Sequence, residues 1–223
     1  MLDWIRRKIR RLLGREVRSQ KRKAKSKVRR KVRQEATSQA RKAIQQKHAK
    51  AISGKMFKSF EAFKKSWEKN ASDPIQSVYH FLIGAYNYLQ DKQLGEEMLT
   101  LVLSTKHNKK DKSSASGFRL GPSNKRLIGE LMKDENIIKS YLGGTYEKDY
   151  EDFNEKKPVM QYLYTREDEA QKDKYLSIFI QSGGKDLPTP VSLGKNNEGQ
   201  WKVVEFSSVS TGCRKPMSEE GNF

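Results

Sequence analysis

The first fifty residues constrain the fold most, because they carry nearly all of the net charge and little that a core could bury. Residues 1–50 hold 20 Lys and Arg against 3 acidic residues, a net charge of +17, whereas residues 51–223 hold 26 against 24, a net charge of +2. Such asymmetry is typical of a basic arm attached to a near-neutral globular domain. We therefore expect residues 1–50 to form a basic helical arm outside the core.

The beginning of the arm predicts an amphipathic helix. When its residues are placed at about 100° intervals, the apolar side chains share one sector and the basic side chains take the remainder. Trp4 lies beside the apolar stripe, where its ring suits either a lipid headgroup region or a groove on a partner protein. The residues predicted to insert into a membrane or a partner are Leu2, Trp4, Ile5, Ile9, Leu12 and Leu13.

The remainder of the arm is also strongly basic. Residues 18–34 contain ten Lys and Arg and no acid, and neither Pro nor Gly interrupts residues 15–50, so helix is expected to continue. Like charges three and four positions apart repel each other, and an anionic partner would relieve that repulsion. The predicted anion-binding residues are Arg6, Arg7, Arg10, Arg11, Lys21, Arg22, Lys23, Lys25, Lys27, Arg29, Arg30, Lys31 and Arg33.

Residues 51–72 predict an amphipathic connecting helix, because large apolar side chains recur at helical intervals. Such a face either packs on the domain core or stays available to lipid or a partner protein. The side chains concerned are Ile52, Met56, Phe60, Phe63 and Trp67.

Residues 73–217 predict a globular domain, followed by a short tail at 218–223. Asp73 suits a helix N-cap and Pro74 the first helical position, and the apolar pattern that follows predicts a central helix. Shorter helices are expected afterwards, with Ser123 as a cap and Gly143 at a stop.

After residue 158 the pattern changes to alternation, which predicts strands at 159–165, 174–181, 190–193 and 200–208. Asn196 to Gly199 is a hairpin signal. The connections are too short for crossover helices, so the sheet of about four strands should be antiparallel. Helices followed by such a sheet make the predicted fold class α+β, with the helices packed on the sheet.

Composition also excludes several classes of protein. Cys213 is the single cysteine, so no intrachain disulfide can form, and no CxxC or HxxxH spacing suggests a metal site. No stretch approaches the roughly 20 apolar residues of a transmembrane helix, and arginines interrupt any secretory signal. We expect a cytoplasmic protein, peripheral at a membrane, without metal or cofactor.

The ending PTPVSLGKNNEGQWKVVEFSSVSTGCRKP resembles the closing hairpin of bacterial domains with cystatin-like or nuclear-transport-factor-like α+β folds. The shared features are the turn before GQWKVVEF, the small residues 207–210 and the terminal Gly212, Arg214 and Pro216. With the helix-then-sheet order, the resemblance extends over residues 73–217. It implies a curved sheet around a long helix with a conical pocket, near which Tyr79, His80 and Tyr86 would lie.

These features predict a non-catalytic binding module that attaches to an anionic surface, above all a membrane, through its basic amphipathic helix. One alternative is a nucleic-acid-binding protein that uses the arm on phosphates. Another is a bacterial cargo or effector protein whose basic segment is a loading or targeting signal, recognised by an acidic protein. Enzymatic activity is not expected, because a Tyr stripe at helical spacing is more often core than chemistry.

Overall fold

The computed structural model of the chain describes residues 49–167 and 174–220. These residues all belong to one compact unit. The predicted basic helix, its insertion residues and its anion-binding residues lie outside the described part of the chain.

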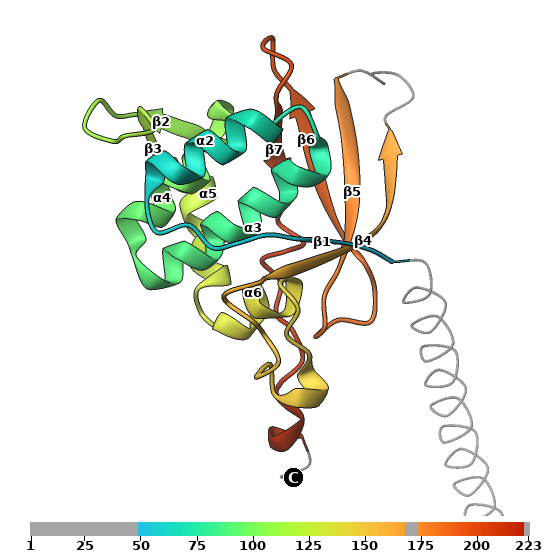
Figure 1. Cartoon of the computed structure of the whole chain (residues 1–223). Coiled ribbons are helices and arrows are strands. Elements are labelled where there is room, and N and C mark those ends of the chain that lie inside the picture. The colour runs from blue at the N-terminus through green and yellow to red at the C-terminus, as the bar shows by residue number, and fades with distance from the viewer. Residues whose placement is uncertain (1–48, 168–173, 221–223) are drawn as a thin grey trace, which may run out of the picture. The chain divides into compact units, whose positions relative to one another are not determined.

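The fold is mixed α+β, as the sequence predicted, and its main sheet is antiparallel throughout (Figure 1). The sheet has five strands in the order β1-β4-β5-β6-β7. All four strands expected after residue 158 are present, and one strand comes from the beginning of the described chain. The strands are β1 (Lys50–Ser53), β4 (Val159–Glu167), β5 (Tyr175–Gln181), β6 (Thr189–Lys195) and β7 (Trp201–Glu205).

The strand β1 corrects the prediction of a helix over residues 51–72. Its residues pair with β4, with Lys50 opposite Tyr162 and Ser53 opposite Val159. The helix begins only at Phe60, where the side chain of Ser59 caps it by accepting from the backbone N–H of Ala62. An apolar spacing of four residues fits a helix, but it is also a multiple of the two-residue period of a strand. Pairing with the free edge of β4 favours the strand over the helix at these residues.

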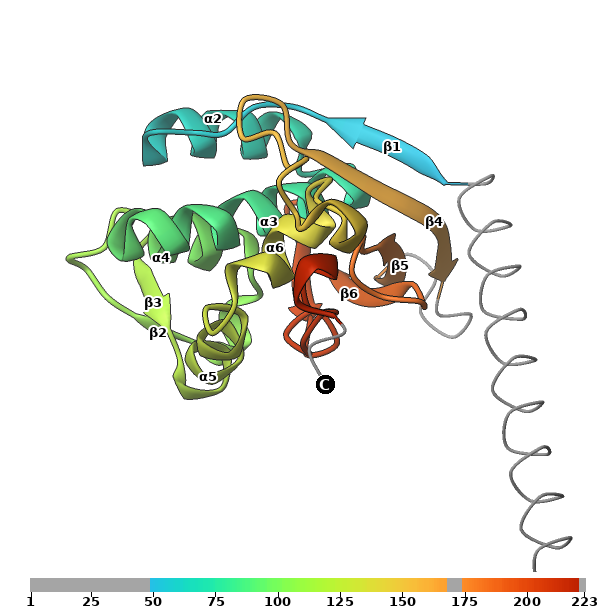
Figure 2. The same cartoon turned by 90° about the horizontal axis from the view of Figure 1, so that it is seen from below.

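The helices lie together on one side of the main sheet, as Figures 1 and 2 both show. The helix α2 packs on the core with Phe60, Phe63 and Trp67 buried, so it is not a detachable aromatic face. The described helices are α2 (Phe60–Asn70), α3 (Pro74–Gln90), α4 (Lys92–Val102), α5 (Pro122–Leu131) and α6 (Glu135–Tyr141).

The central helix is α3, and its start follows the sequence prediction. Asp73 is the N-cap, its Oδ1 accepting from the backbone N–H of Ile75 at 2.8 Å, and Pro74 occupies the first turn. Every residue from Ser77 to Asn87 is buried. A helix buried on all sides belongs in the middle of a core, and here α3 packs against α2, α4, α6 and strands β5 and β7.

The helix α5 begins differently from the prediction, which had placed the cap at Ser123. The N-cap is Gly121, without a side-chain hydrogen bond, and Pro122 opens the helix. Proline is pre-organised for the first helical position because its φ is already helical. The helix α6 ends as expected, with Gly143 at a φ of 110° just beyond it.

Between α4 and α5 the chain forms a small second sheet of β2 (Asn108–Lys110) and β3 (Phe118–Leu120). The sequence pattern had predicted strands only after residue 158. Three short 3₁₀ helices complete the described elements: η1 (Thr105–His107), η2 (Tyr146–Lys148) and η3 (Met217–Glu219). The predicted tail therefore starts within η3, where the backbone N–H of Ser218 donates to Asp149 Oδ1 at 2.9 Å.

Alternation along the strands turns one sheet face toward the helices. Ile178, Ile180, Val191 and Leu193 are all buried, while their neighbours in sequence are only half-buried. The hairpin between β6 and β7 forms at the predicted place, with Gly199 at a φ of 79° and its N–H donating to the carbonyl of Asn196. Within the ranges the structure describes, no helix is both long and apolar enough to cross a bilayer.

Candidate functional site

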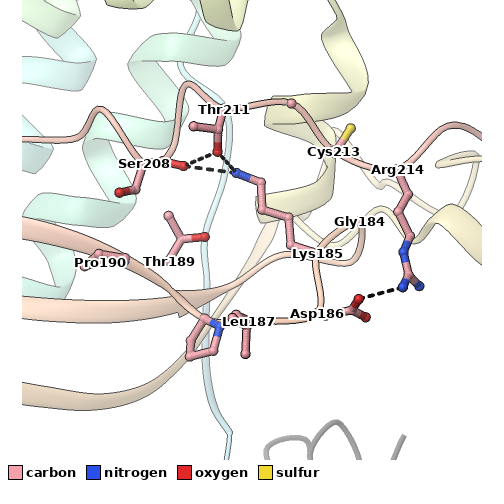
Figure 3. A pocket seen from close by; sticks show the side chains of 12 residues that line it. Gly184, Lys185, Asp186, Leu187, Thr189, Pro190, Ser208, Thr211, Cys213 and Arg214 are labelled. Atoms are coloured by element: carbon pink, nitrogen blue, oxygen red, sulfur yellow. Dashed lines mark hydrogen bonds and ion pairs between the residues drawn. The ribbon is translucent and has the colours of Figure 1, made fainter. Parts of the chain in front are cut away.

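A pocket of about 550 Å³ opens between two loops of the domain (Figure 3). One loop, residues 182–188, connects β5 to β6 and leads into Thr189 and Pro190 at the start of β6, and the other, residues 208–214, follows β7. We call this cavity, lined by residues 184–190, Ser208 and residues 211–214, the Lys185 pocket. Its volume lies within the range of about 300–1,000 Å³ common for small-ligand sites.

The helix α6 anchors the first loop at both ends. At one end, the backbone N–H of Gly183 donates to the carbonyl of Ser140 at 2.8 Å, and Ser140 Oγ lies 2.7 Å from Ser182 Oγ. At the other end, the hydroxyl of Tyr141 lies 2.8 Å from Thr189 Oγ1. These buried hydrogen bonds hold the pocket wall to a rigid element.

The second loop is fastened directly to the first. The backbone N–H of Arg214 donates to the carbonyl of Gly184 at 2.9 Å, and the hydroxyl of Tyr150 donates to the carbonyl of Arg214 at 2.6 Å. A Cβ at Gly184 would collide with the Tyr150 hydroxyl and would lie 2.8 Å from Cys213 Cβ. Only glycine allows the two loops to approach so closely.

Lys185 is the central polar group of the pocket. Its Nζ donates to the carbonyl of Ser208 at 3.0 Å and to Thr211 Oγ1 at 2.8 Å, and it lies 5.4 Å from the centre of the Tyr141 ring. None of the described carboxylates forms an ion pair with it. Burial lowers the pKa of Lys185 to about 8 because the ammonium loses hydration.

The other two charges of the pocket neutralise each other. Arg214 Nη2 lies 2.7 Å from Asp186 Oδ2, and the guanidinium carbon lies 4.8 Å from the centre of the Tyr146 ring. Lys185, Asp186 and Arg214 are the charged residues among those that line the pocket, so the pocket carries a net charge of +1.

Cys213 lies at the pocket without the features of a nucleophile. Its Sγ lies 3.9 Å from Asp134 Oδ2, and burial raises the pKa of the thiol above its ordinary value. The thiol is therefore protonated at neutral pH, and the thiolate is the reactive form of cysteine.

The three residues predicted to lie near a pocket sit on α3, inside the core. Tyr79, His80 and Tyr86 are 3%, 2% and 6% exposed, and none of them lines the Lys185 pocket. Tyr79 and His80 are brought together, with ring centres 6.2 Å apart, whereas Tyr86 packs on Phe153. Burial raises the pKa of Tyr79 to about 12, so its hydroxyl stays protonated and donates to the carbonyl of Pro158.

Sequence reasoning missed Lys185, which lies in the short connection between the strands predicted at 174–181 and 190–193. Loops have no periodicity that would single out one lysine, and its two partners lie more than twenty residues further along the chain. Arg214 was noticed only as part of the closing Gly-x-Arg-x-Pro. Across the described ranges, no group of three or more His, Cys, Asp or Glu side chains could hold a metal ion.

Comparison with known proteins gives one match. The model of a family described as Domain of unknown function (DUF6935) matches residues 55–217, which include α2 to β7 and all of the Lys185 pocket. No curated protein and no solved structure matches the chain. The resemblance to cystatin-like and nuclear-transport-factor-like folds therefore stays a prediction.

Proposed function

The chain belongs to the DUF6935 family through residues 55–217, and we propose that it is a non-catalytic binding module. In this proposal, residues 1–50 attach the module to an anionic surface, and a membrane is the surface we favour. The domain that carries the pocket is then the part displayed at that surface.

The observation that carries the proposal is the separation of charge along the chain. Residues 1–50 have a net charge of +17, while residues 51–223 have only +2. A Lys or Arg close to an anionic leaflet contributes on the order of 1 kcal/mol, so several of them suffice for stable and reversible attachment. The near-neutral domain would add little to this attraction.

The apolar stripe of the first thirteen residues favours lipid over nucleic acid. Ile5, Ile9 and Leu12 would add a hydrophobic contribution that contacts with phosphates do not require. Residues 15–50 contain no Phe, Tyr or Trp, so the arm lacks the aromatic side chains on which unpaired bases stack.

Co-sedimentation with vesicles tests the proposal. The full chain should sediment with phosphatidylserine-containing vesicles and much less with pure phosphatidylcholine vesicles. Replacing Ile5, Ile9 and Leu12 by Ser should reduce the sedimented fraction severalfold, because it removes the apolar stripe without changing any charge. A variant with Ala24, Ala36 and Ala40 replaced by Ser is the matched control and should sediment like the wild type.

A parallel gel-shift experiment with RNA and DNA separates the alternatives. Binding to nucleic acid without binding to anionic vesicles would replace the membrane proposal with the nucleic-acid one. Failure to bind either would leave an acidic protein as the partner of the arm, which is the loading or targeting alternative. Equal loss of both activities in the Ile5, Ile9 and Leu12 variant would contradict the role assigned to the apolar stripe.

A further inference from the structure

Lys185 has one N–H donor and a positive charge that no hydrogen bond or ion pair within the described fold satisfies. An ammonium group has three N–H donors, and two of them are engaged with Ser208 and Thr211. The third donor and the charge remain, because the described acidic side chains give Lys185 no ion pair. A desolvated cation without a counterion is costly for a fold, which makes it a sign of binding when it lines an open pocket.

The charge of the pocket selects the kind of anion. Arg214 is already paired with Asp186, so one positive charge is left for a ligand. A single charge matches a carboxylate better than a phosphate dianion, which would leave one negative charge uncompensated in a partly buried site.

The opposite wall of the pocket is apolar. Leu187, Pro188 and Pro190 are its apolar lining residues, and Leu187 is 60% exposed, whereas most Leu side chains are buried. In Figure 3, Leu187 and Pro190 lie on the other side of the pocket from the Lys185 amine. A ligand that joins one anionic group to an apolar body would satisfy both sides.

We propose that the Lys185 pocket binds a small organic acid, with the carboxylate on the Lys185 ammonium and the apolar body against Leu187, Pro188 and Pro190. The residues of this site all belong to the domain, and the inference does not depend on the proposed attachment to an anionic surface.

The surroundings of Lys185 also predict a pH dependence. Its amine lies over the Tyr141 ring of α6, and the Cys213 thiol and the paired Asp186 and Arg214 line the same pocket. The pKa values of Tyr141 and Cys213 are raised by burial, so both are neutral near pH 7. Lys185 is the group that titrates near pH 8, and binding of a carboxylate should weaken as pH rises through this value because the ammonium is lost.

A titration of the full chain with benzoate, followed by two-dimensional amide NMR, tests the proposal. Benzoate should shift the amide signals of residues 184–187 and 211–214, whereas benzamide, which is neutral and has the same shape, should bind at least about tenfold more weakly. Inorganic phosphate should compete poorly with benzoate.

Variants of Lys185 test whether its positive charge binds the carboxylate. Lys185→Met should weaken benzoate binding about tenfold or more, and Lys185→Arg should restore part of it. Lys112→Met, which removes an exposed lysine elsewhere, is the matched control and should bind like the wild type. If Lys185→Met does not fold, the comparison of benzoate with benzamide on the wild-type protein still tests whether the pocket prefers an anionic ligand.

Three results would overturn the inference: no shifts at the pocket amides, equal affinity for benzoate and benzamide, or unchanged benzoate affinity in a folded Lys185→Met variant. Tighter binding of phosphate than of benzoate would overturn the choice of a carboxylate. None of these results bears on vesicle binding, so the two proposals fail separately.

Discussion

His80 shows how one buried side chain can report on the stability of the whole core. Its Nδ1 lies 2.7 Å from the carbonyl of Gln76, and its Nε2 lies 3.1 Å from Ser66 Oγ. A carbonyl only accepts, so Nδ1 carries the proton and Nε2 accepts from the serine hydroxyl. The rings of Phe57 and Phe63 enclose the imidazole. The neutral ring is fully satisfied. A proton on Nε2 would reverse the bond to Ser66, whose hydroxyl oxygen can also accept, but it would place a positive charge in the buried site.

Burial lowers the pKa of His80 below its ordinary value of 6.5, and this predicts acid sensitivity. The unfolded chain binds a proton near pH 6.5 more readily than the folded protein does. The contribution of neutral His80 to the stability of the folded protein is therefore complete above about pH 6.5. It is lost as pH falls through the lower pKa that His80 has in the folded state. The midpoint of thermal unfolding should fall as pH is lowered from 7.5 to about 5, measured by circular dichroism.

The variant His80→Gln provides the control for this prediction. It should be less stable than the wild type at pH 7.5 but should lose less stability on acidification. His48 and His107 remain in the variant, so an undiminished pH dependence there would assign the effect to other groups and contradict the role of His80.

At the scale of elements, the crossing of α3 and α4 depends on one glycine. A Cβ at Gly95 in α4 would overlap the backbone nitrogen and Cα of Tyr88 in α3. Backbone atoms cannot move aside as the end of a side chain can, so the two helices would have to separate. Glycine in a helix is unfavourable by about 1 kcal/mol relative to alanine, and close packing is the compensating reason for its presence here.

We predict that Gly95→Ala destabilises the protein by at least about 2 kcal/mol, a value typical of overpacking in a core. Gly129→Ala is the matched control, since it changes the same residue type in helix α5, where nothing lies within 4 Å of the added Cβ. That variant should gain up to about 1 kcal/mol from helix propensity and reduced unfolded-state entropy. Urea denaturation measures both, and equal effects would show that the close contact does not matter.

The whole molecule combines two parts with different physical demands. The domain buries large apolar side chains on α2, α3 and the sheet, and its charges nearly cancel. Residues 1–50 carry the net charge. A proposed attachment through the charged segment should therefore respond to salt much more than ligand binding in the domain does.

Raising sodium chloride from about 0.05 M to 0.5 M shortens the Debye length severalfold, and we expect vesicle co-sedimentation of the full chain to fall steeply over this range. Benzoate binding should weaken less, because the half-buried Lys185 is less screened than exposed charges. Vesicle binding that persists unchanged in high salt would indicate that apolar contacts alone hold the protein to the bilayer.

Much of the fold follows from local patterns in the sequence. The N-cap at Asp73, the alternation of Ile178 and Ile180, and the turn ending at Gly199 are encoded by neighbouring residues, and all were predicted. The charge separation at residue 50 is likewise a property of the sequence alone.

The tertiary structure decided what depends on distant contacts. Strand β1 exists because β4 offers it a free edge, which overrides the helical spacing of Ile52 and Met56. The Lys185 pocket exists because α6 and the β6–β7 hairpin bring residues 184–190 beside residues 208–214. No local pattern specifies where the amine of one loop lysine will lie or how much water it loses, because burial is set by the packing of segments far apart in the chain.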